Sequence, residues 1–379
     1  MDGDVSPGTS RDVTAADVLA AQARLRPYLP ATPLHYAERF GCWLKLENLQ
    51  RTGSYKVRGA LNPLLAARER GDTRPVIAAS AGNHAQGLAW AAYRLGIAAI
   101  TVMPRAAPQT KIAGVAHWGA TVRLHGDSYD EAKAFPAELA AQHDYRVLSA
   151  FDDPDVIAGQ GTVGLELAAL GPDVVLVPIG GGGLASGVAL ALKSARLSGT
   201  QASRRVRVIG AQVEGVDSMR RALRGDDEPR DPAATLADGV RVKEPGHLTR
   251  RLLGQVLDDI VVVREARRRE TLVRLGLEEH VIAEGAGALA LAAGRRVASK
   301  RKCAVVSGGN LDAGVLAQLL SQVRPRAPRR PRRRHREPSA PPSLEPAIAT
   351  ILSGSVLPAS NPPPRAAFAT RAHDEELHA

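Results

Sequence analysis

The sequence predicts an α/β protein whose sheets are mostly parallel and divided between two lobes. Between Arg74 and Val323, short runs rich in β-branched residues alternate with Ala- and Leu-rich stretches of helical length. Most of the short runs are apolar throughout, and continuous apolar strands that alternate with helices are typical of parallel sheets covered on both faces. Eight such strands are many for one sheet, so we expect two lobes.

The predicted elements alternate along this part of the chain. Strands are expected at Val76–Ala79, Ala99–Val102, Thr121–Leu124, Arg146–Leu148, Val174–Ile179, Val206–Ala211, Ile260–Val263 and Cys303–Val306. Helices between them are expected at His84–Leu95, Gly161–Ala169, Leu184–Ala195 and Arg267–Glu279. No internal repeat of solenoid length occurs, which argues against a repeat architecture.

The composition is that of a globular protein in a reducing compartment. Of the 379 residues, 44% are hydrophobic and 23% are charged, which argues against a disordered chain. Cys42 and Cys303 are the only cysteines, and their separation argues against a disulfide scaffold or a zinc site. No stretch approaches the roughly 20 apolar residues that span a bilayer, and the N-terminus lacks a secretory pattern. We therefore expect a cytoplasmic protein with no metal site.

Much of the positive charge lies at the C-terminus. The net charge is +11, and residues 324–379, with ten Arg, no Lys and five acidic residues, carry +5 of it. This segment also holds 11 of the 26 Pro, and it has too little apolar surface to offset its ordering entropy, so we predict disorder. The segment 324–336 contains eight Arg without interleaved aromatic residues, which predicts only non-specific, salt-dependent binding of an anionic polymer such as nucleic acid.

Segments rich in glycine and small polar residues follow three predicted strands at their carboxyl ends. These segments are Ser80–His84, Gly180–Gly183 and Ser307–Asn310. Doubly wound sheets bind ligands beyond the carboxyl ends of their strands, and glycine lets a ligand approach the backbone closely. Three segments at this kind of position predict one shared binding crevice.

The four consecutive glycines, Gly180–Gly183, predict a phosphate site. They follow a strand and precede a helix that begins near Leu184, so free N–H groups lie at a positive helix end. The loop also matches the dinucleotide pattern G-x-G-x-x-A, which requires an acidic residue at the end of the next strand. Gln212 stands at that position, which favours a single phosphate. A tight turn without a ligand is the alternative.

Lys56 is the candidate nucleophile. We expect Ser54 to cap the helix that runs through Leu61–Ala67, which places Lys56 in its first turn. A positive helix end and burial both disfavour the ammonium form, and both therefore favour the neutral amine that forms a Schiff base. Judged from these residues alone, a solvated lysine beside Arg58 is the stronger alternative.

Taken together, these motifs resemble those of fold-type II pyridoxal-phosphate enzymes. The similar segments, in the same order and spacing, are ENLQRTGSYKVRGA (47–60), SAGNHAQG (80–87), FDDPDVIAGQGTVGLE (151–166), VPIGGGGL (177–184), ADGVRVKEPGHLT (237–249), EGAGALA (284–290) and SGGN (307–310). The chain looks like a member of the serine/threonine dehydratase family and is most similar to the threonine ammonia-lyases (threonine dehydratases). The resemblance covers about residues 13–320.

The resemblance implies a two-lobed fold like that of the tryptophan synthase β chain. A larger cofactor-binding lobe would comprise residues 13–70 and 146–323, and a smaller lobe, residues 71–145, would carry the asparagine loop. Residues 1–12 would form a flexible N-terminus, and residues 324–379 would form the Arg/Pro-rich disordered tail. The family also suggests a homo-oligomer, either a dimer or a tetramer.

The resemblance further implies pyridoxal 5′-phosphate as cofactor and assigns roles to individual residues. Lys56 would carry the cofactor and act as the base at the substrate Cα, and Tyr55, where Phe is usual, would pack on the ring. Asn83 would bind the ring hydroxyl oxygen, and Ser307 would face the pyridine nitrogen. The phosphate would lie on the backbone of Gly180, Gly181, Gly182, Gly183 and Leu184, and the substrate carboxylate on Ser80, Ala81, Gly82, Asn83 and His84.

The implied reaction is the deamination of L-threonine, and of L-serine, by α,β-elimination of water. The products would be ammonia and 2-oxobutanoate or pyruvate, in isoleucine biosynthesis or threonine catabolism. Serine racemase or serine dehydratase activity is the alternative within the family. Racemases carry a serine directly after the position of Ser80, where this chain has Ala81, and their metal ligands correspond to Gln212 and Ser218, with Glu214 and Asp217 nearby. One methyl group is worth only about 1–3 kcal/mol in a pocket, so threonine and serine both stay open.

Overall fold

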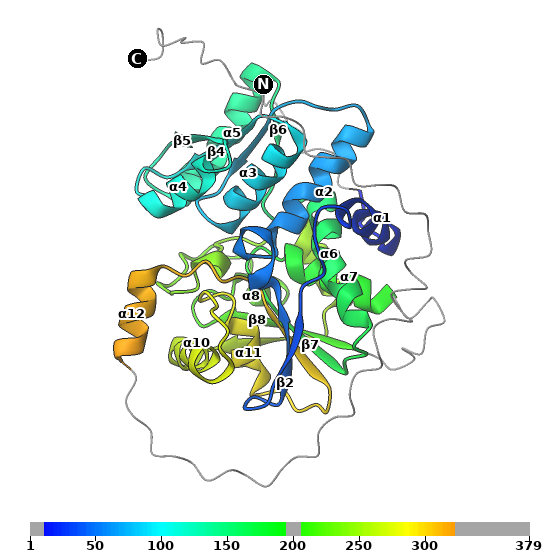
Figure 1. The fold of residues 1–379 in the computed structure, drawn as a ribbon, viewed down its shortest axis with the longest axis vertical. Coiled ribbons are helices and arrows are strands. Elements are labelled where there is room, and N and C mark those ends of the chain that lie inside the picture. The colour runs from blue at the N-terminus through cyan, green and yellow to red at the C-terminus, as the bar shows by residue number, and fades with distance from the viewer. Residues whose placement is uncertain (1–10, 195–205, 323–379) are drawn as a thin grey trace. The chain divides into compact units, whose positions relative to one another are not determined.

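The computed structural model of the chain describes residues 11–194 and 206–322. Within these residues it contains a six-stranded sheet in the order β1-β2-β10-β7-β8-β9 and a four-stranded sheet in the order β5-β4-β3-β6 (Figure 1). The predicted disordered tail, residues 324–379, and most of the predicted flexible N-terminus lie outside the described residues. No helix of the described part combines the length and the apolarity that a membrane crossing requires.

The six-stranded sheet combines one antiparallel hairpin with parallel strands. Its strands are β1 (Leu34–Ala37), β2 (Cys42–Leu46), β7 (Val174–Pro178), β8 (Arg207–Val213), β9 (Asp259–Val263) and β10 (Lys302–Val306). β1 pairs with β2 in antiparallel register, and every other neighbouring pair in this sheet is parallel. The helices in the same parts of the chain are α1 (Ala15–Leu25), α2 (Lys56–Glu69), α6 (Pro154–Ala168), α7 (Gly183–Ser194), α8 (Ser218–Ala222), α9 (His247–Val256), α10 (Glu265–Glu279), α11 (Leu289–Gly294) and α12 (Ala313–Ser321).

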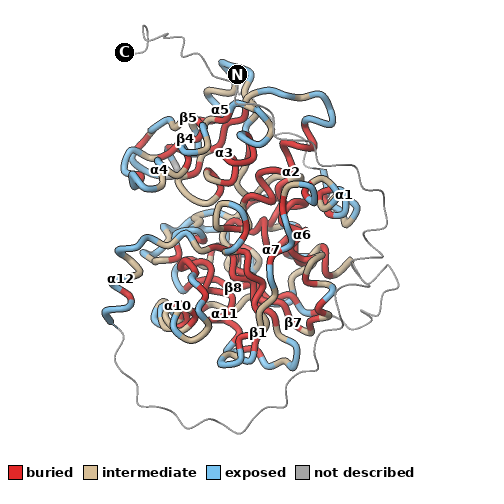
Figure 2. Tube along the Cα trace, in the orientation of Figure 1, coloured by how far each residue is buried: buried red, intermediate tan, exposed pale blue. Residues whose placement is uncertain are grey.

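The central strand β7 shows why a continuous apolar run is needed here. Successive side chains of a strand point to opposite faces of the sheet. Val174 and Leu176 belong to the core cluster that contains α11, whereas Val175 and Val177 belong to the cluster that contains α7. Helices therefore cover both faces of the sheet, and Figure 2 shows the strand as a buried segment of the tube.

The four-stranded sheet is entirely parallel. Its strands are β3 (Val76–Ala79), β4 (Ala99–Met103), β5 (Thr121–Leu124) and β6 (Arg146–Val147), and the helices that follow are α3 (Asn83–Leu95), α4 (Gln109–Ala116) and α5 (Tyr129–His143). Val76 and Ala78 pack with α2 and α3 on one face, and Ile77 packs with α5 on the other. The α/β class with two mostly parallel sheets is confirmed.

The predicted strands are all present, and each of their ends lies within two residues of its prediction. Two boundaries need correction, and one hairpin is missing from the prediction. β6, which the predicted division at residue 146 assigns to the larger lobe, pairs with β3 in the four-stranded sheet. α6 begins at Pro154 rather than at Gly161, with Asp153 as its N-cap. The hairpin β1–β2 is absent from the prediction, although residues 42–46 combine apolar and aromatic side chains in a strand of five.

The start of α2 also differs from the prediction. Lys56 lies in the first turn, as expected, and is the first helical residue, but the N-cap is Tyr55 and no side chain caps the helix. Ser54 is extended and forms an isolated β-bridge with Gly308, so the expected cap at Ser54 is wrong. Instead, the backbone N–H of Tyr55 donates to the carbonyl oxygen of Ser307 over 3.1 Å, which ties the helix start to the end of β10.

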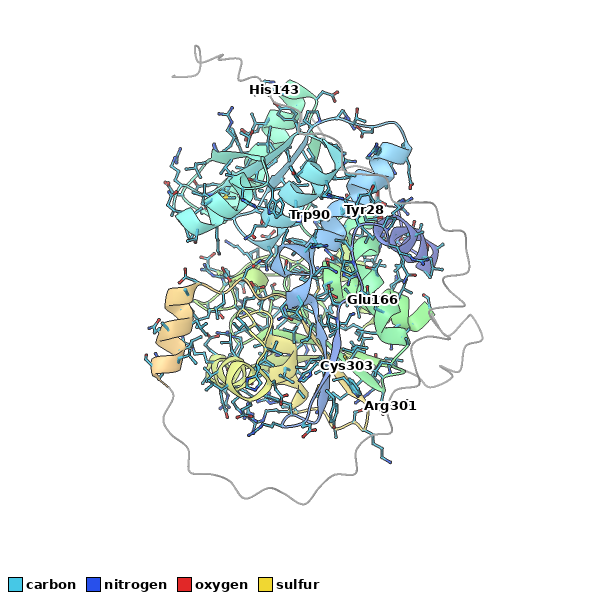
Figure 3. The ribbon with its side chains drawn as sticks, in the orientation of Figure 1. Tyr28, Trp90, His143, Glu166, Arg301 and Cys303 are labelled. Carbon is cyan, nitrogen blue, oxygen red and sulfur yellow. The ribbon has the colours of Figure 1, made fainter. Side chains whose placement is uncertain are left out.

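A buried ion cluster fixes α2 against α6. The Arg58 guanidinium donates to both carboxylate oxygens of Glu47, each over 2.8 Å, and to Glu166 on α6 over 2.6 Å. Lys45 on β2 pairs with the same Glu166 carboxylate, which is labelled in Figure 3. Because Arg58 lies only two residues after Lys56, this cluster holds the first turn of α2 in place.

Candidate functional site

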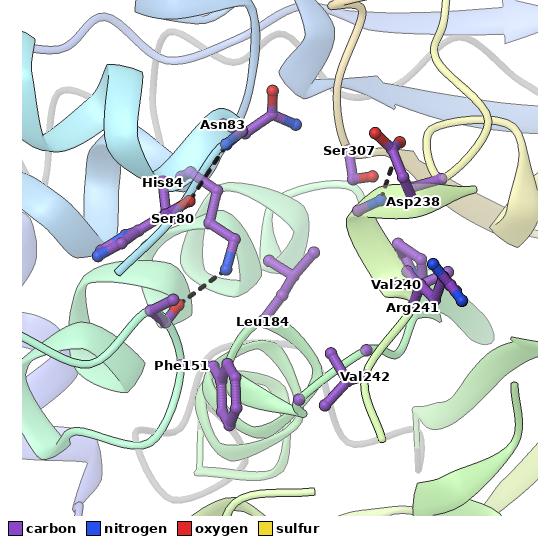
Figure 4. A pocket seen from close by; sticks show the side chains of 18 of the residues that line it. Ser80, Asn83, His84, Phe151, Leu184, Asp238, Val240, Arg241, Val242 and Ser307 are labelled. Carbon is purple, nitrogen blue, oxygen red and sulfur yellow. Dashed lines mark hydrogen bonds between the residues drawn. The ribbon is translucent and has the colours of Figure 1, made fainter. Parts of the chain in front are cut away.

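A cavity of about 310 Å³ gathers segments that follow strands of both sheets. Every residue that the sequence predicts for the site lines it: Tyr55, Lys56, Ser80, Ala81, Gly82, Asn83, His84, Gly180, Gly181, Gly182, Gly183, Leu184 and Ser307. In Figure 4, Ser80, Asn83 and His84 lie to the left of the view, and Ser307 and Asp238 lie to the right. The three glycine-rich and polar segments therefore share one cavity, as expected.

The amine of Lys56 lies in the wall of this cavity, and its side chain is partly buried. Its Nζ donates to the carbonyl oxygen of Ala150 over 2.7 Å and lies 5.5 Å from the centre of the Tyr55 ring. Burial lowers the pKa of Lys56 to about 8, although the carboxyl group of Glu284 acts in the opposite direction. The surface-lysine alternative is therefore excluded, and the amine is much more readily deprotonated than an ordinary lysine.

The glycine loop is shaped by the protein behind it. Gly182 has φ +102°, which side chains of L residues rarely adopt, and a Cβ there would lie 2.7 Å from Cβ of Thr249. A Cβ on Gly181 would lie 2.3 Å from Cγ of Phe151. Within the described chain, the N–H groups of Gly181, Gly182 and Gly183 donate no backbone hydrogen bond. They lie at the start of α7, which suits them to an anionic group.

The loop at the start of α3 presents backbone and polar groups to the cavity. Ser80 Oγ accepts from the N–H of Gly82 over 3.3 Å. The buried His84 ring has no hydrogen-bond partner among the described residues. Burial lowers the pKa of His84 to about 3, and the charge of Lys56 acts in the same direction, so the imidazole is neutral.

Several lining residues were not singled out from the sequence. Glu284 is buried in the cavity wall and accepts from Asn83 Nδ2 over 2.7 Å. Asp238 pairs with Lys111 over 2.7 Å, which joins α4 to the short 3-10 helix Asp238–Val240. Phe151 packs against the glycine loop. All but Lys111 lie in or beside the segments 151–166, 237–249 and 284–290, but their chemistry depends on contacts that only the fold creates.

Two residues that the resemblance matched to a metal site are engaged within the protein. β8 extends to Val213, so Gln212 lies inside the strand and not after its end, and Glu214 follows the strand. Gln212 Oε1 accepts from the N–H of Arg220 over 2.9 Å, and Ser218 Oγ donates to the carbonyl oxygen of Val242 over 2.9 Å. No group of three or more His, Cys, Asp or Glu side chains that could hold a metal ion occurs in the described ranges.

The lining of the cavity fits the cofactor that the resemblance implies. Pyridoxal phosphate requires an amine for its aldehyde, donors for its phosphate and a partner for its ring nitrogen. The Lys56 amine, the N–H groups of the glycine loop and the Ser307 hydroxyl all line the same cavity. No side-chain hydrogen bond joins Ser307 to another described residue, so its hydroxyl is available to donate or accept.

Comparison with known proteins agrees with this chemistry. Residues 25–308 match the family described as "Pyridoxal-phosphate dependent enzyme". The chain is 41% identical to an L-threonine ammonia-lyase of Thermotoga maritima, over 82% of this chain and 79% of that protein. It is 39% identical to the catabolic L-threonine dehydratase TdcB of Escherichia coli, over 81% and 96%. Maize serine racemase has a similar structure, with a TM-score of 0.75 and 30% identity over 82% of this chain and 98% of that chain.

Proposed function

The chain belongs to the family of pyridoxal-phosphate-dependent enzymes, and from this premise we propose that it is a lyase that deaminates L-threonine and, as a second substrate, L-serine. The reaction is the α,β-elimination of water, which yields ammonia and 2-oxobutanoate or pyruvate. The names of two relatives with about 40% identity support the threonine reaction. The single observation that carries the proposal is the amine of Lys56, which has a lowered pKa and lies in one cavity with the glycine loop.

The Lys56 amine and the glycine loop have different roles in the proposed reaction. When bound, pyridoxal phosphate acts as an electron sink for the substrate Cα. The neutral amine of Lys56 removes the proton at Cα, which its lowered pKa permits near neutral pH. The N–H groups of Gly181, Gly182 and Gly183 bind an anionic group at the positive end of α7.

The loop that begins at Ser80 orients the substrate. It precedes the N-terminus of α3, where backbone N–H groups and the helix dipole attract a carboxylate. The neutral His84 ring adds no charge there. Ser307, a neutral hydroxyl, offers a hydrogen bond without the negative charge of a carboxylate.

The proposal is tested by adding L-threonine, and then L-serine, to the holoenzyme. We expect the cofactor absorbance to change on addition of either amino acid and a 2-oxo acid to accumulate, faster with threonine. Lys56→Ala protein measured alongside should form no 2-oxo acid above the uncatalysed background. A holoenzyme that binds threonine but forms no 2-oxo acid contradicts the proposed function.

The lowered pKa of Lys56 leads to a prediction for pH. Only the neutral amine attacks an aldehyde, so the rate of covalent attachment of the cofactor to cofactor-free protein should rise about tenfold per pH unit and level off near pH 8. Stopped-flow absorbance gives this rate. A model peptide with one ordinary lysine corrects for titration of the cofactor itself. After that correction, a rate that keeps rising to about pH 10, as for an unperturbed lysine, would contradict the lowered pKa of Lys56.

Serine racemisation is the second candidate, because maize serine racemase has a similar fold. Racemisation needs a group that delivers a proton to the opposite face of the substrate. Ala81 lines the cavity at the position where the resemblance places the racemase serine, and its methyl side chain has no hydroxyl to supply that proton. We therefore expect little D-serine from L-serine, and chiral chromatography of the reaction mixture measures it. D-serine formed as fast as pyruvate would favour the racemase instead.

A further inference from the structure

A buried carboxyl group in the cavity has no part in the reaction proposed above. Glu284 lies between α10 and α11, and its side chain is in the cavity wall. Burial raises the pKa of this carboxyl to about 7, and Asp238 acts in the same direction. The hydrogen bond from Asn83 and the charges of Lys111 and Lys56 act in the opposite direction. Burying a carboxyl group costs free energy unless hydrogen bonds replace those that it makes with water.

Glu284 ends a chain of hydrogen bonds between side chains. Asn310 Nδ2 donates to Asn83 Oδ1 over 2.8 Å, and Asn83 Nδ2 donates to Glu284 Oε1 over 2.7 Å. Asn83 is the first residue of α3, beside the four-stranded sheet, whereas Asn310 follows β10 of the six-stranded sheet. The chain of hydrogen bonds therefore joins elements of the two sheets at the cavity.

The two hydrogen-bond partners of Asn83, Asn310 and Glu284, require the same orientation of its amide. The amide group of Asn310 presents its N–H donors to the oxygen of Asn83. Glu284 Oε1 accepts a hydrogen bond from Asn83, so the NH₂ group of Asn83 lies on the side of Glu284. The NH₂ group has two N–H bonds, and Glu284 takes one of them. The second N–H remains for another acceptor in the cavity.

The backbone provides room for this contact. A Cβ on Gly308 would lie 2.3 Å from Glu284 Oε1 and 3.2 Å from Asn83 Nδ2. The backbone N–H of Glu284 also donates to the carbonyl oxygen of Gly308 over 3.0 Å. Glycine at position 308 is therefore required for the carboxylate to reach the amide, which is a second and independent sign that the contact is built into the fold.

We propose that Glu284 is a positioning residue of the cofactor site, which holds the Asn83 amide so that its second N–H can donate to an oxygen of the bound cofactor. The inference rests on the proposed function only through the cofactor, and it concerns cofactor binding rather than turnover. Without an acceptor at position 284, only the hydrogen bond from Asn310 opposes a half-turn of the Asn83 amide. Its carbonyl oxygen would then face the cofactor oxygen and repel it.

The experiment measures the dissociation constant of pyridoxal phosphate by absorbance titration of cofactor-free protein. Glu284→Ala should weaken binding about tenfold, the effect expected for one hydrogen bond to a charged group. Glu284→Gln should stay within about threefold of wild type, because the amide oxygen of glutamine still accepts a hydrogen bond. In an Asn83→Ala background, Glu284→Ala should cause no further loss, because a residue that acts through Asn83 has nothing left to position.

The proposal is overturned if Glu284→Ala binds the cofactor as tightly as wild type, or if Glu284→Gln binds it as weakly as Glu284→Ala. It is also overturned if Glu284→Ala raises the dissociation constant by the same factor in the Asn83→Ala background as in wild type. If Glu284→Ala does not fold, Asn310→Ala removes the other hydrogen bond to Asn83 and must weaken binding for the proposal to stand. Glu69→Ala, an exposed carboxylate outside the cavity, is the matched control. A wild-type protein that binds the cofactor but forms no 2-oxo acid overturns the proposed function alone.

Discussion

Lys56→Ala is expected to lower kcat/KM for threonine by about 10⁴-fold or more, at the upper limit of what a lost general base accounts for. The variant loses both the amine that attaches the cofactor and the base at the substrate Cα. Alanine cannot replace either function, and no second lysine lines the cavity in the described ranges except Lys111, which is paired with Asp238. The 2-oxo acid assay measures the loss.

The matched control is Lys133→Ala, which removes an exposed lysine of α5. The activity of this control should stay within about twofold of wild type, because a surface substitution outside the core and outside any hydrogen-bond network changes stability little. Thermal melting of both variants shows whether they remain folded. A folded Lys56→Ala protein that retains more than about one-hundredth of wild-type activity contradicts the assignment of Lys56 as the base.

Arg58→Met is expected to lower the free energy of unfolding by about 3–5 kcal/mol, the usual effect of removing one partner of a buried ion pair. The substitution keeps most of the side-chain volume but leaves Glu47, which is completely buried, without its guanidinium. Urea unfolding of the two proteins measures the difference. Arg105→Met is the control, because Arg105 and its partner Asp127 are both exposed, and such pairs contribute about 0–1 kcal/mol. Equal losses of unfolding free energy in the two variants would show that the buried ion cluster stabilises the protein no more than an exposed ion pair does.

The same cluster predicts how stability depends on pH. Burial raises the pKa of the Glu166 carboxyl, but Arg58 and Lys45 beside it outweigh burial and lower the pKa below its usual range. A carboxyl whose pKa is lower in the folded state stabilises the protein above its unfolded pKa, and this stability is lost as the pH falls through the folded pKa. Arg58→Met should therefore reduce the loss of stability that wild type shows on acidification.

Much of the fold and of the site is readable from the sequence because both depend on local pattern. Parallel strands buried on both faces must be apolar at every position, as Val174–Pro178 are, and a ligand at the carboxyl ends of such strands meets the segments that follow them. The loops at Ser80 and Gly180 therefore come together in one cavity without any knowledge of the strand order.

What the sequence does not reveal depends on contacts between distant residues. Glu284 lies in an Ala- and Gly-rich segment with no local sign of chemistry, and its function arises from a contact with Asn83, which lies 201 residues earlier. Ser54 has the residue type of a helix cap, but pairing with Gly308 takes its backbone out of the helix. The pKa of Lys56 likewise depends on burial by segments remote in sequence.

The glycine loop combines both cases. Its position after β7 and before α7 predicts an anion site from local pattern alone. The reason that glycine is required at Gly181 and Gly182 lies behind the loop, where Phe151 and Thr249 leave no room for a Cβ. Local pattern thus predicts what the loop binds, whereas tertiary packing explains why no other residue can form it.

We expect the amine of Lys56 to carry the cofactor, and reduction with borohydride identifies the lysine that does. Reduction makes the bond between amine and cofactor permanent, so that proteolysis and mass spectrometry identify the modified residue. We expect one pyridoxyl group per chain, on the peptide that contains Lys56. A pyridoxyl group on Lys111 or another lysine, or no modification of a protein that has been incubated with the cofactor, would show that Lys56 does not carry the cofactor.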